Sequence, residues 1–213
     1  MFLPLLIEMK GRKVLIVGGG KVALRRAKTL SEAEADITVI APAYIEGWED
    51  IAASRHHRPY EPGDAVGFDL VCAATDSAAA NDAVRKDCAE NGIPLNDAVD
   101  GDSGDVIFPG VVREGGYTAA IASGGKTPFL TKKIKNDIRE VLSAYDAELL
   151  SYLASVRAYI IENHPEEKET LLRKLAALSP SELREKGDPH DLTDRLQREP
   201  AGPDPDEADG GGH

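Results

Sequence analysis

Short apolar runs alternate with helical segments along the first half of the chain. Four runs rich in β-branched or apolar residues have the length of buried parallel strands: they cover Lys13–Val17, Asp36–Pro42, Phe68–Ala74 and Ile93–Val99. Helices are predicted between them at Lys21–Ala35 and Ala78–Gly92, where Gly92 suits the position just after a helix. Strands that alternate with helices predict an α/β fold with a doubly wound parallel sheet.

The pattern changes after Pro109. Gly110–Ser123 has the pattern of two strands joined at a Gly-Gly pair, which is a hairpin signal. A helix is predicted from Lys126 to Tyr145, and amphipathic helices from Asp146 to Arg198. The last 15 residues contain no apolar face that could be buried, so we expect them to be disordered.

Charge and cysteine content narrow the classes of function. The chain has 213 residues, 42% hydrophobic content and a net charge of -12, which argues against general binding to nucleic acid or anionic membranes. Its two cysteines, Cys72 and Cys88, form neither a CxxC pair nor a zinc motif. The apolar run Phe2–Ile7 is too short to span a membrane and lacks a basic leader. We therefore expect a cytoplasmic protein with no nucleic-acid or membrane partner.

A glycine loop follows the first predicted strand. Gly18, Gly20 and Ala23 have the spacing G-x-G-x-x-A. In that pattern the first glycine permits a tight turn, the second lets a pyrophosphate approach the backbone, and the alanine allows close packing of helix on strand. Because the loop lies between a buried strand and a helix, it predicts a dinucleotide site rather than a plain βα turn.

The usual ribose-binding acid is missing. Ala41-Pro42-Ala43 occupies the end of the second strand, and Asp36 lies at its other end. No arginine follows this strand either, so the sequence leaves open whether the nucleotide is NAD or NADP.

Four ordered motifs together are similar to those of precorrin-2 dehydrogenases. This family includes the N-terminal module of siroheme synthase and stand-alone dehydrogenase/sirohydrochlorin ferrochelatases. The motifs are Leu3–Leu30, Cys72–Val84, Ile93–Gly110 and Ile121–Ile138.

The resemblance implies NAD-dependent oxidation of precorrin-2 to sirohydrochlorin. Bifunctional members also insert ferrous iron, as a second substrate, to give siroheme. The implied fold is a Rossmann-type domain, a small α+β dimerisation domain and a C-terminal helical domain, in an intertwined homodimer. The corresponding boundaries are 1–109, 110–145 and 146–198, followed by a disordered acidic tail at 199–213.

The resemblance also assigns site residues. Its essential aspartate falls on Asp100, which lies just past a predicted strand, where such sheets bind their ligands. The nucleotide contacts are expected at Gly18, Gly19, Gly20, Lys21, Val22, Pro42, Ala43, Ala74 and Thr75. The substrate carries eight carboxylates, so basic residues and a small-residue loop are expected to bind it: Arg113, Ser123, Gly124, Lys126 and Lys132.

The chain departs from the family pattern in two places. The usual pattern before and at the aspartate is Asn-Val-Val-Asp, and this chain departs from it by having Asp97 and Ala98. Glu34 stands where members often have a glycine that closes the first helix. The run that contains Asp97, Asp100, Asp102 and Asp105 does not have the spacing of a calcium loop. No metal-ligand residues are predicted, and Asp97 has no assigned role.

One alternative belongs to a different class. A non-catalytic Rossmann module that senses nucleotides would share the glycine loop. Such modules normally carry the acidic residue after the second strand and have no need of Asp100 or the Ser123-Gly124 loop, so the enzyme is the preferred interpretation.

Overall fold

The computed structural model describes residues 2–100, 103–124, 127–185 and 187–198. It contains two compact units: Met1–Gly110 with Ala122–Pro128, and Val111–Ile121 with Phe129–His213. The finer division into four segments remains a prediction, and the predicted disordered tail lies outside the described residues.

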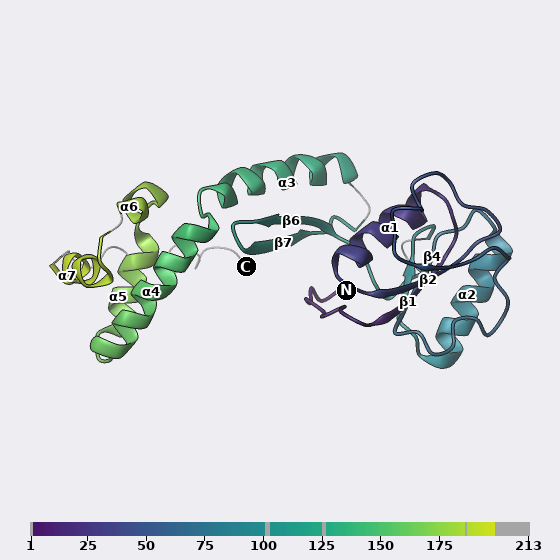
Figure 1. Ribbon diagram of the computed structural model, residues 1–213, viewed down its shortest axis with the longest axis horizontal. Coiled ribbons are helices and arrows are strands. Elements are labelled where there is room, and N and C mark those ends of the chain that lie inside the picture. Colours follow the sequence, from purple (N-terminus) through teal and green to yellow (C-terminus); the bar gives the residue numbers. More distant parts are fainter. Residues whose placement is uncertain (1, 101–102, 125–126, 186, 199–213) are drawn as a thin grey trace, which may run out of the picture. The chain divides into compact units, whose positions relative to one another are not determined.

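The first unit is built on one parallel sheet (Figure 1). Its strands are β1 Lys13–Val17, β2 Asp36–Ile40, β3 Ser54–His56, β4 Leu70–Ala73 and β5 Leu95–Asp97. They lie in the order β3-β2-β1-β4-β5, and every pairing is parallel. The chain therefore winds outward in both directions from β1, and the topological switch point lies between β1 and β4.

Alternate residues of β1 pack on opposite faces of the sheet, as the period of a strand requires. Val14 and Ile16 belong to the core beneath α1 (Lys21–Glu32), and Leu15 and Val17 belong to the core beneath α2 (Ala78–Asn91). Because both faces are covered, the strand is almost wholly apolar. The predicted Rossmann-type α/β architecture is confirmed.

The two helices of this unit end differently. Gly92 ends α2 in the left-handed conformation, with φ 64°, as predicted. At the end of α1, Glu34 adopts the same region, with φ 56°, and its N–H donates to the carbonyl of Ser31 at 3.0 Å. A non-glycine residue is strained in this region. The glutamate at position 34 therefore strains the backbone at the end of α1.

The second unit begins with a hairpin and a long helix. β6 (Gly110–Glu114) and β7 (Tyr117–Ile121) pair through Gly115 and Gly116, both at positive φ, as a tight hairpin turn requires. The α3 helix covers Pro128–Ser143. A Cβ on Gly115 would lie 1.9 Å from the carbonyl oxygen of Tyr145, so this turn packs closely on the backbone after α3.

Four further helices share an apolar core in this unit (Figure 1). They are α4 Ala147–Asn163, α5 Lys168–Ala177, α6 Pro180–Arg184 and α7 Pro189–Arg198. Ser179 and Glu182 form a capping box at the start of α6. Within the described residues, no helix combines the length and the apolar character that crossing a membrane requires.

Candidate nucleotide-binding and catalytic site

The glycine loop after β1 is fixed by contacts between backbone segments. Gly18 has φ 128°, and a Cβ there would lie 2.2 Å from the carbonyl oxygen of Ala74. A Cβ on Gly19 would lie 1.9 Å from the carbonyl oxygen of Ala43. Around Gly20, by contrast, no atom lies within 4 Å of the Cβ position. The first two glycines therefore let strand-end loops pack together, and the third leaves open space at the start of α1.

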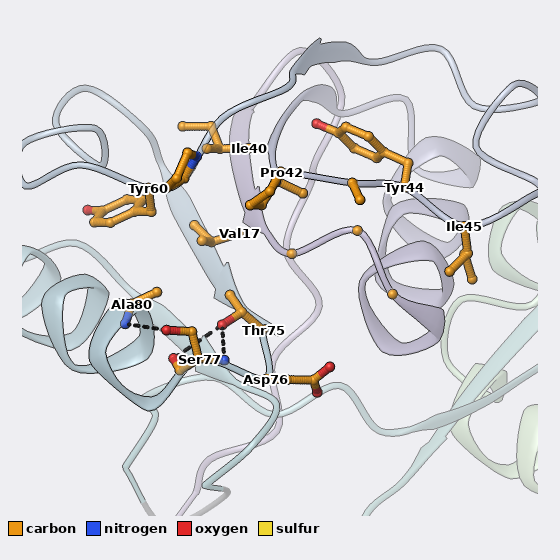
Figure 2. Close-up of a pocket in the computed structure, with 16 residues that line it drawn as sticks. Val17, Ile40, Pro42, Tyr44, Ile45, Tyr60, Thr75, Asp76, Ser77 and Ala80 are labelled. Carbon is orange, nitrogen blue, oxygen red and sulfur yellow. Dashed lines mark hydrogen bonds between the residues drawn. The ribbon is translucent and has the colours of Figure 1, made fainter.

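A cavity of about 600 Å³ lies beside this loop, at the carboxyl ends of β1, β2 and β4. Its lining comes from segments 17–20, 40–45, 59–60 and 75–77, together with Ala80 (Figure 2). This is where doubly wound sheets bind nucleotides.

Most of the predicted nucleotide contacts meet in this cavity. Six of them line it: Gly18, Gly19, Gly20, Pro42, Ala43 and Thr75. The other three do not: Lys21 and Val22 are exposed at the start of α1, and the carbonyl of Ala74 faces Gly18.

The cavity fits a dinucleotide. Gly20 precedes α1 without a side-chain cap, so the first amides of the helix are available to a phosphate. Among the described residues that line the cavity, Asp76 alone is charged. No lysine or arginine is among those described lining residues.

Two aromatic residues, missed in the sequence, hold the loops that form the cavity. Trp48 is buried, and its indole N–H donates to the carbonyl of Gly19 at 2.9 Å. The hydroxyl of Tyr44 lies 3.0 Å from the carbonyls of both Val39 and His56. The contacts of Trp48 with Gly19 and of Tyr44 with His56 join residues 29 and 12 positions apart, so no local spacing could have revealed them.

Tyr60 is another lining residue that the sequence did not indicate. Its hydroxyl donates to the carboxylate of Asp87, which also accepts the N–H of Gly63 at 2.6 Å. Burial and the bond to Asp87 raise the pKa of Tyr60 above its usual value. The hydroxyl of Tyr60 is thus anchored to Asp87 on α2.

The turn between β4 and α2 is held by short polar side chains. The Thr75 hydroxyl accepts the N–H of Ser77 at 2.8 Å, and the Ser77 hydroxyl accepts the N–H of Ala80 at 3.3 Å (Figure 2). Asn81 donates its side-chain N–H to the carbonyl of Thr75 at 2.9 Å. A Ser followed by a helical segment is a usual capping signal, so this part of the lining was accessible from the sequence.

Asp97 and Asp100 differ sharply at the end of β5. The side chain of Asp97 is fully buried, and its Oδ1 accepts the N–H groups of Val99 and Asp100 at 2.9 and 2.8 Å. Its Oδ2 accepts from Arg85 Nε at 2.7 Å. Asp100 is exposed, and the Ser103 hydroxyl donates to its Oδ2 at 2.5 Å. Asp97 therefore shapes the loop from inside, whereas Asp100 lies on the exposed part of it.

The rest of this loop is also tied to β5. The buried side chain of Asn96 donates to the carbonyl of Val106 at 2.7 Å, and the carbonyl of Leu95 accepts the N–H groups of Asp105 and Val106 at 2.8 and 3.0 Å. These bonds fit the predicted turn. Asp102 lies outside the described residues.

The predicted substrate residues fall in both units. The Ser123 hydroxyl accepts the N–H of Thr127 at 3.4 Å, and Gly124 has φ 59°. Both lie in the first unit, whereas Arg113 on β6 and Lys132 on α3 are exposed in the second. Lys126 lies outside the described residues. A shared carboxylate-binding surface therefore remains a prediction.

The cysteines belong to the core, as expected. Both are free and buried. Burial raises the pKa of Cys72 to about 12 and that of Cys88 to about 11, so both thiols stay protonated near neutral pH.

Comparison with known proteins gives concordant matches. Residues 5–110 match the model of an NAD(P)-binding family. Siroheme synthase from Azotobacter vinelandii is 35% identical over 163 residues, which are 75% of this chain and 35% of that protein. Siroheme synthase from Ectopseudomonas mendocina is 32% identical over 92% of this chain and 50% of that protein. The chain thus spans from about a third to half of these relatives' length.

A solved structure extends the likeness of fold. The precorrin-2 dehydrogenase SirC superposes with a TM-score of 0.69 over 93% of this chain and 100% of that chain, at 24% sequence identity. At this identity the match shows the likeness of fold alone.

Proposed function

Because the chain belongs to the family of the NAD(P)-binding N-terminal module of siroheme synthases, we propose that it oxidises precorrin-2 to sirohydrochlorin. The observation that supports the proposal most directly is that two groups lie at the carboxyl ends of the strands. The glycine-lined cavity lies at the ends of β1, β2 and β4, and Asp100 comes three residues after the end of β5. A hydride acceptor and a proton acceptor are the two parts that this dehydrogenation needs.

The residues divide the chemistry between them. Bound NAD⁺ supplies the hydride acceptor. The backbone of Gly18–Gly20 and the start of α1 hold its pyrophosphate, and the lining around Pro42 and Ala43 holds the adenosine end. Asp100 takes the proton that leaves the substrate carbon, so that precorrin-2 and NAD⁺ give sirohydrochlorin, NADH and a proton.

Substrate binding is assigned to the basic residues and the small-residue loop. The tetrapyrrole's carboxylates require local positive charge on a chain whose net charge is -12. Arg113 and Lys132 are exposed, and Gly124 supports a tight loop beside Ser123. These assignments rest on the family motif and on exposure.

Two finer parts of the proposal concern iron and assembly. If ferrous iron is inserted as a second substrate, we propose that Asp100 also accepts the protons that leave the pyrrole N–H groups; an assay with ferrous or cobaltous ion tests this step. A homodimer is proposed from the family resemblance, and the exposed Phe129 and Val141 on α3 fit a covered surface. Sedimentation velocity tests the dimer.

The decisive test of the main proposal is an anaerobic assay with precorrin-2 and NAD⁺. Growth of both NADH fluorescence and sirohydrochlorin absorbance is expected. NAD⁺ binding without turnover would instead support the nucleotide-sensing alternative. The lack of a cation in the cavity lining predicts weaker use of NADP⁺ than of NAD⁺.

A further inference from the structure

We propose that Asp97 and Arg85 are positioning residues, which hold the Asp100 backbone in a fixed place relative to the wall of the nucleotide cavity. The proposal rests on the proposed function, since it names a further requirement of the same site. It also gives a role to the family departure at position 97, for which the sequence offers no explanation.

The first step of the argument is the turn that Asp97 makes. One carboxylate oxygen, Oδ1, accepts two successive backbone N–H groups, from Val99 at 2.9 Å and from Asp100 at 2.8 Å. A side chain that accepts amides two and three residues ahead fixes the local backbone. The N–H of Asp100 itself is one of the two donors. The direction in which the Asp100 side chain leaves the strand is therefore set by Asp97.

The second step is the link to α2. The other oxygen of Asp97 accepts from Arg85 Nε at 2.7 Å, and the Arg85 guanidinium also contacts Asp82 Oδ1 at 2.5 Å. The same helix supplies Ala80, and its cap Ser77, to the lining of the cavity. Arg85 thus connects the helix that forms one wall of the cavity with the loop that carries Asp100.

The third step is burial. The side chain of Asp97 is 0% exposed and that of Arg85 is 28% exposed. A buried carboxylate is retained only when it is paired and hydrogen-bonded. Asp97 meets both conditions, because it accepts from Arg85 Nε and from the N–H groups of Val99 and Asp100. Such a pair holds its geometry better than an exposed one, whose side chains move freely in solvent.

A second, more exposed ion pair in the same unit provides a control: the Asp69 side chain is 41% exposed, whereas that of Asp97 is 0% exposed. Asp69 accepts the N–H of Lys13 at 2.9 Å and the guanidinium of Arg12 at 3.2 Å. It therefore makes the same two kinds of contact as Asp97. Asp69 directly precedes β4 and lies beside the first residue of β1, at the opposite end of these strands from the cavity. Loss of Asp69 reports the effect of losing an exposed pair that is remote from the cavity.

The experiment compares Asp97→Ala, Asp97→Asn and Asp69→Ala in the full chain. Asparagine keeps an oxygen for the two amides but loses the charge opposite Arg85, and alanine loses both. For Asp97→Ala we expect kcat to fall by about 10- to 100-fold, with an unchanged Kd for NADH, because a small displacement of a catalytic group is costly. We expect kcat of Asp97→Asn to lie between those of Asp97→Ala and the wild type, because its oxygen still accepts the two amides while its amide N–H₂ faces the Arg85 Nε–H, donor against donor.

A second readout does not depend on turnover. Amide hydrogen exchange at Val99 and Asp100 should accelerate by about 10-fold in Asp97→Ala, remain near wild type in Asp97→Asn and be unaffected in Asp69→Ala. Thermal unfolding of each variant confirms that it is folded under the assay conditions.

The outcomes separate this inference from the proposed function. An active wild type whose folded Asp97→Ala variant keeps full kcat overturns the positioning role. So does unchanged exchange at Val99 and Asp100 in that variant. A wild type that binds NAD⁺ but does not oxidise precorrin-2 contradicts the proposed function instead, while the exchange data still decide whether Asp97 holds the loop.

Discussion

The two loops at the carboxyl edge of the sheet are held in different ways. The loop after β1 is shaped by the absence of side chains, since Gly18 and Gly19 pack against the carbonyls of Ala74 and Ala43. The loop after β5 is shaped by buried polar side chains. Asp97 accepts hydrogen bonds from two backbone N–H groups and from Arg85, and Asn96 donates to the carbonyl of Val106.

This difference explains why the sequence predicted the structure of the first loop but not that of the second. The steric need for glycine produces a local motif with fixed spacing, which can be recognised in the sequence. The hydrogen bonds of Asp97 include one from Arg85, which lies 12 residues earlier on the preceding helix. An aspartate in such a place has the same appearance in the sequence as an aspartate in a solvated turn.

The largest effect is expected from a substitution of Asp100, which should remove the proton acceptor without changing the structure of the loop after β5. Replacement by Asn keeps the shape of the side chain but removes the proton acceptor. We expect kcat to fall by roughly 10²–10⁴-fold, the usual contribution of a general base, while the NADH affinity is retained. Stopped assays with sirohydrochlorin absorbance and NADH fluorescence titration measure the two quantities.

Ser103→Ala serves as a graded control for Asp100. It removes the hydroxyl that donates to the Asp100 carboxylate but leaves the carboxylate itself. We expect a fall of about 10-fold or less in kcat. If Asp100→Asn turns over at the wild-type rate, Asp100 is not the proton acceptor.

The glycine loop should respond to added methyl groups according to the space around each glycine. Gly19→Ala places a Cβ on the Ala43 carbonyl, so we expect a loss of about 1–3 kcal/mol in the free energy of unfolding and weaker NADH binding. Gly20→Ala meets open space and should cost less than about 1 kcal/mol as a change of helix N-cap. Its effect should appear in NADH affinity, because the methyl group lies where the pyrophosphate approaches.

Urea denaturation and NADH titration of both variants provide this test. A Gly19→Ala protein with wild-type stability would show that the close packing of the two loops is not needed. A Gly20→Ala protein with wild-type affinity would place the pyrophosphate elsewhere.

The smallest effect is expected at the far end of α1, the helix that the glycine loop begins. Glu34 is held in the left-handed region, and its ion pair with Lys10, at 2.6 Å, is exposed and worth little. Glu34→Gly should therefore raise the free energy of unfolding by about 0.5–1 kcal/mol, after allowing for the greater entropy of glycine in the unfolded chain.

Glu34→Ala is the matched control, because it removes the ion pair and keeps the strain. It should be no more stable than the wild type by urea denaturation. Equal stabilisation by both variants would assign the effect to the lost carboxylate rather than to the backbone.

Much of the first unit could be predicted from the sequence. Apolar runs such as Lys13–Val17 became strands because residues buried on both faces of a parallel sheet leave a continuous apolar signal. Gly92 ended α2, and in the second unit the Gly115-Gly116 pair closed the hairpin, since positive φ selects glycine. Tyr60, Trp48 and Arg85 were missed, because their roles depend on which distant atoms they meet.

The sequence by itself determined four of the five strands of the first sheet with the helices between them, the steric design of the glycine loop and the position of Asp100 beyond a strand; the exposed strand β3, Ser54–His56, was missed. These follow from local period and spacing, which act between residues that are near one another along the chain. Only the tertiary structure decided that Asp97 is a buried acceptor, that Trp48 holds Gly19 and that Asp87 anchors Tyr60. The physical reason is that a hydrogen bond depends on the distance between two atoms in the folded chain, and that distance is fixed only when the sheet and its helices have packed.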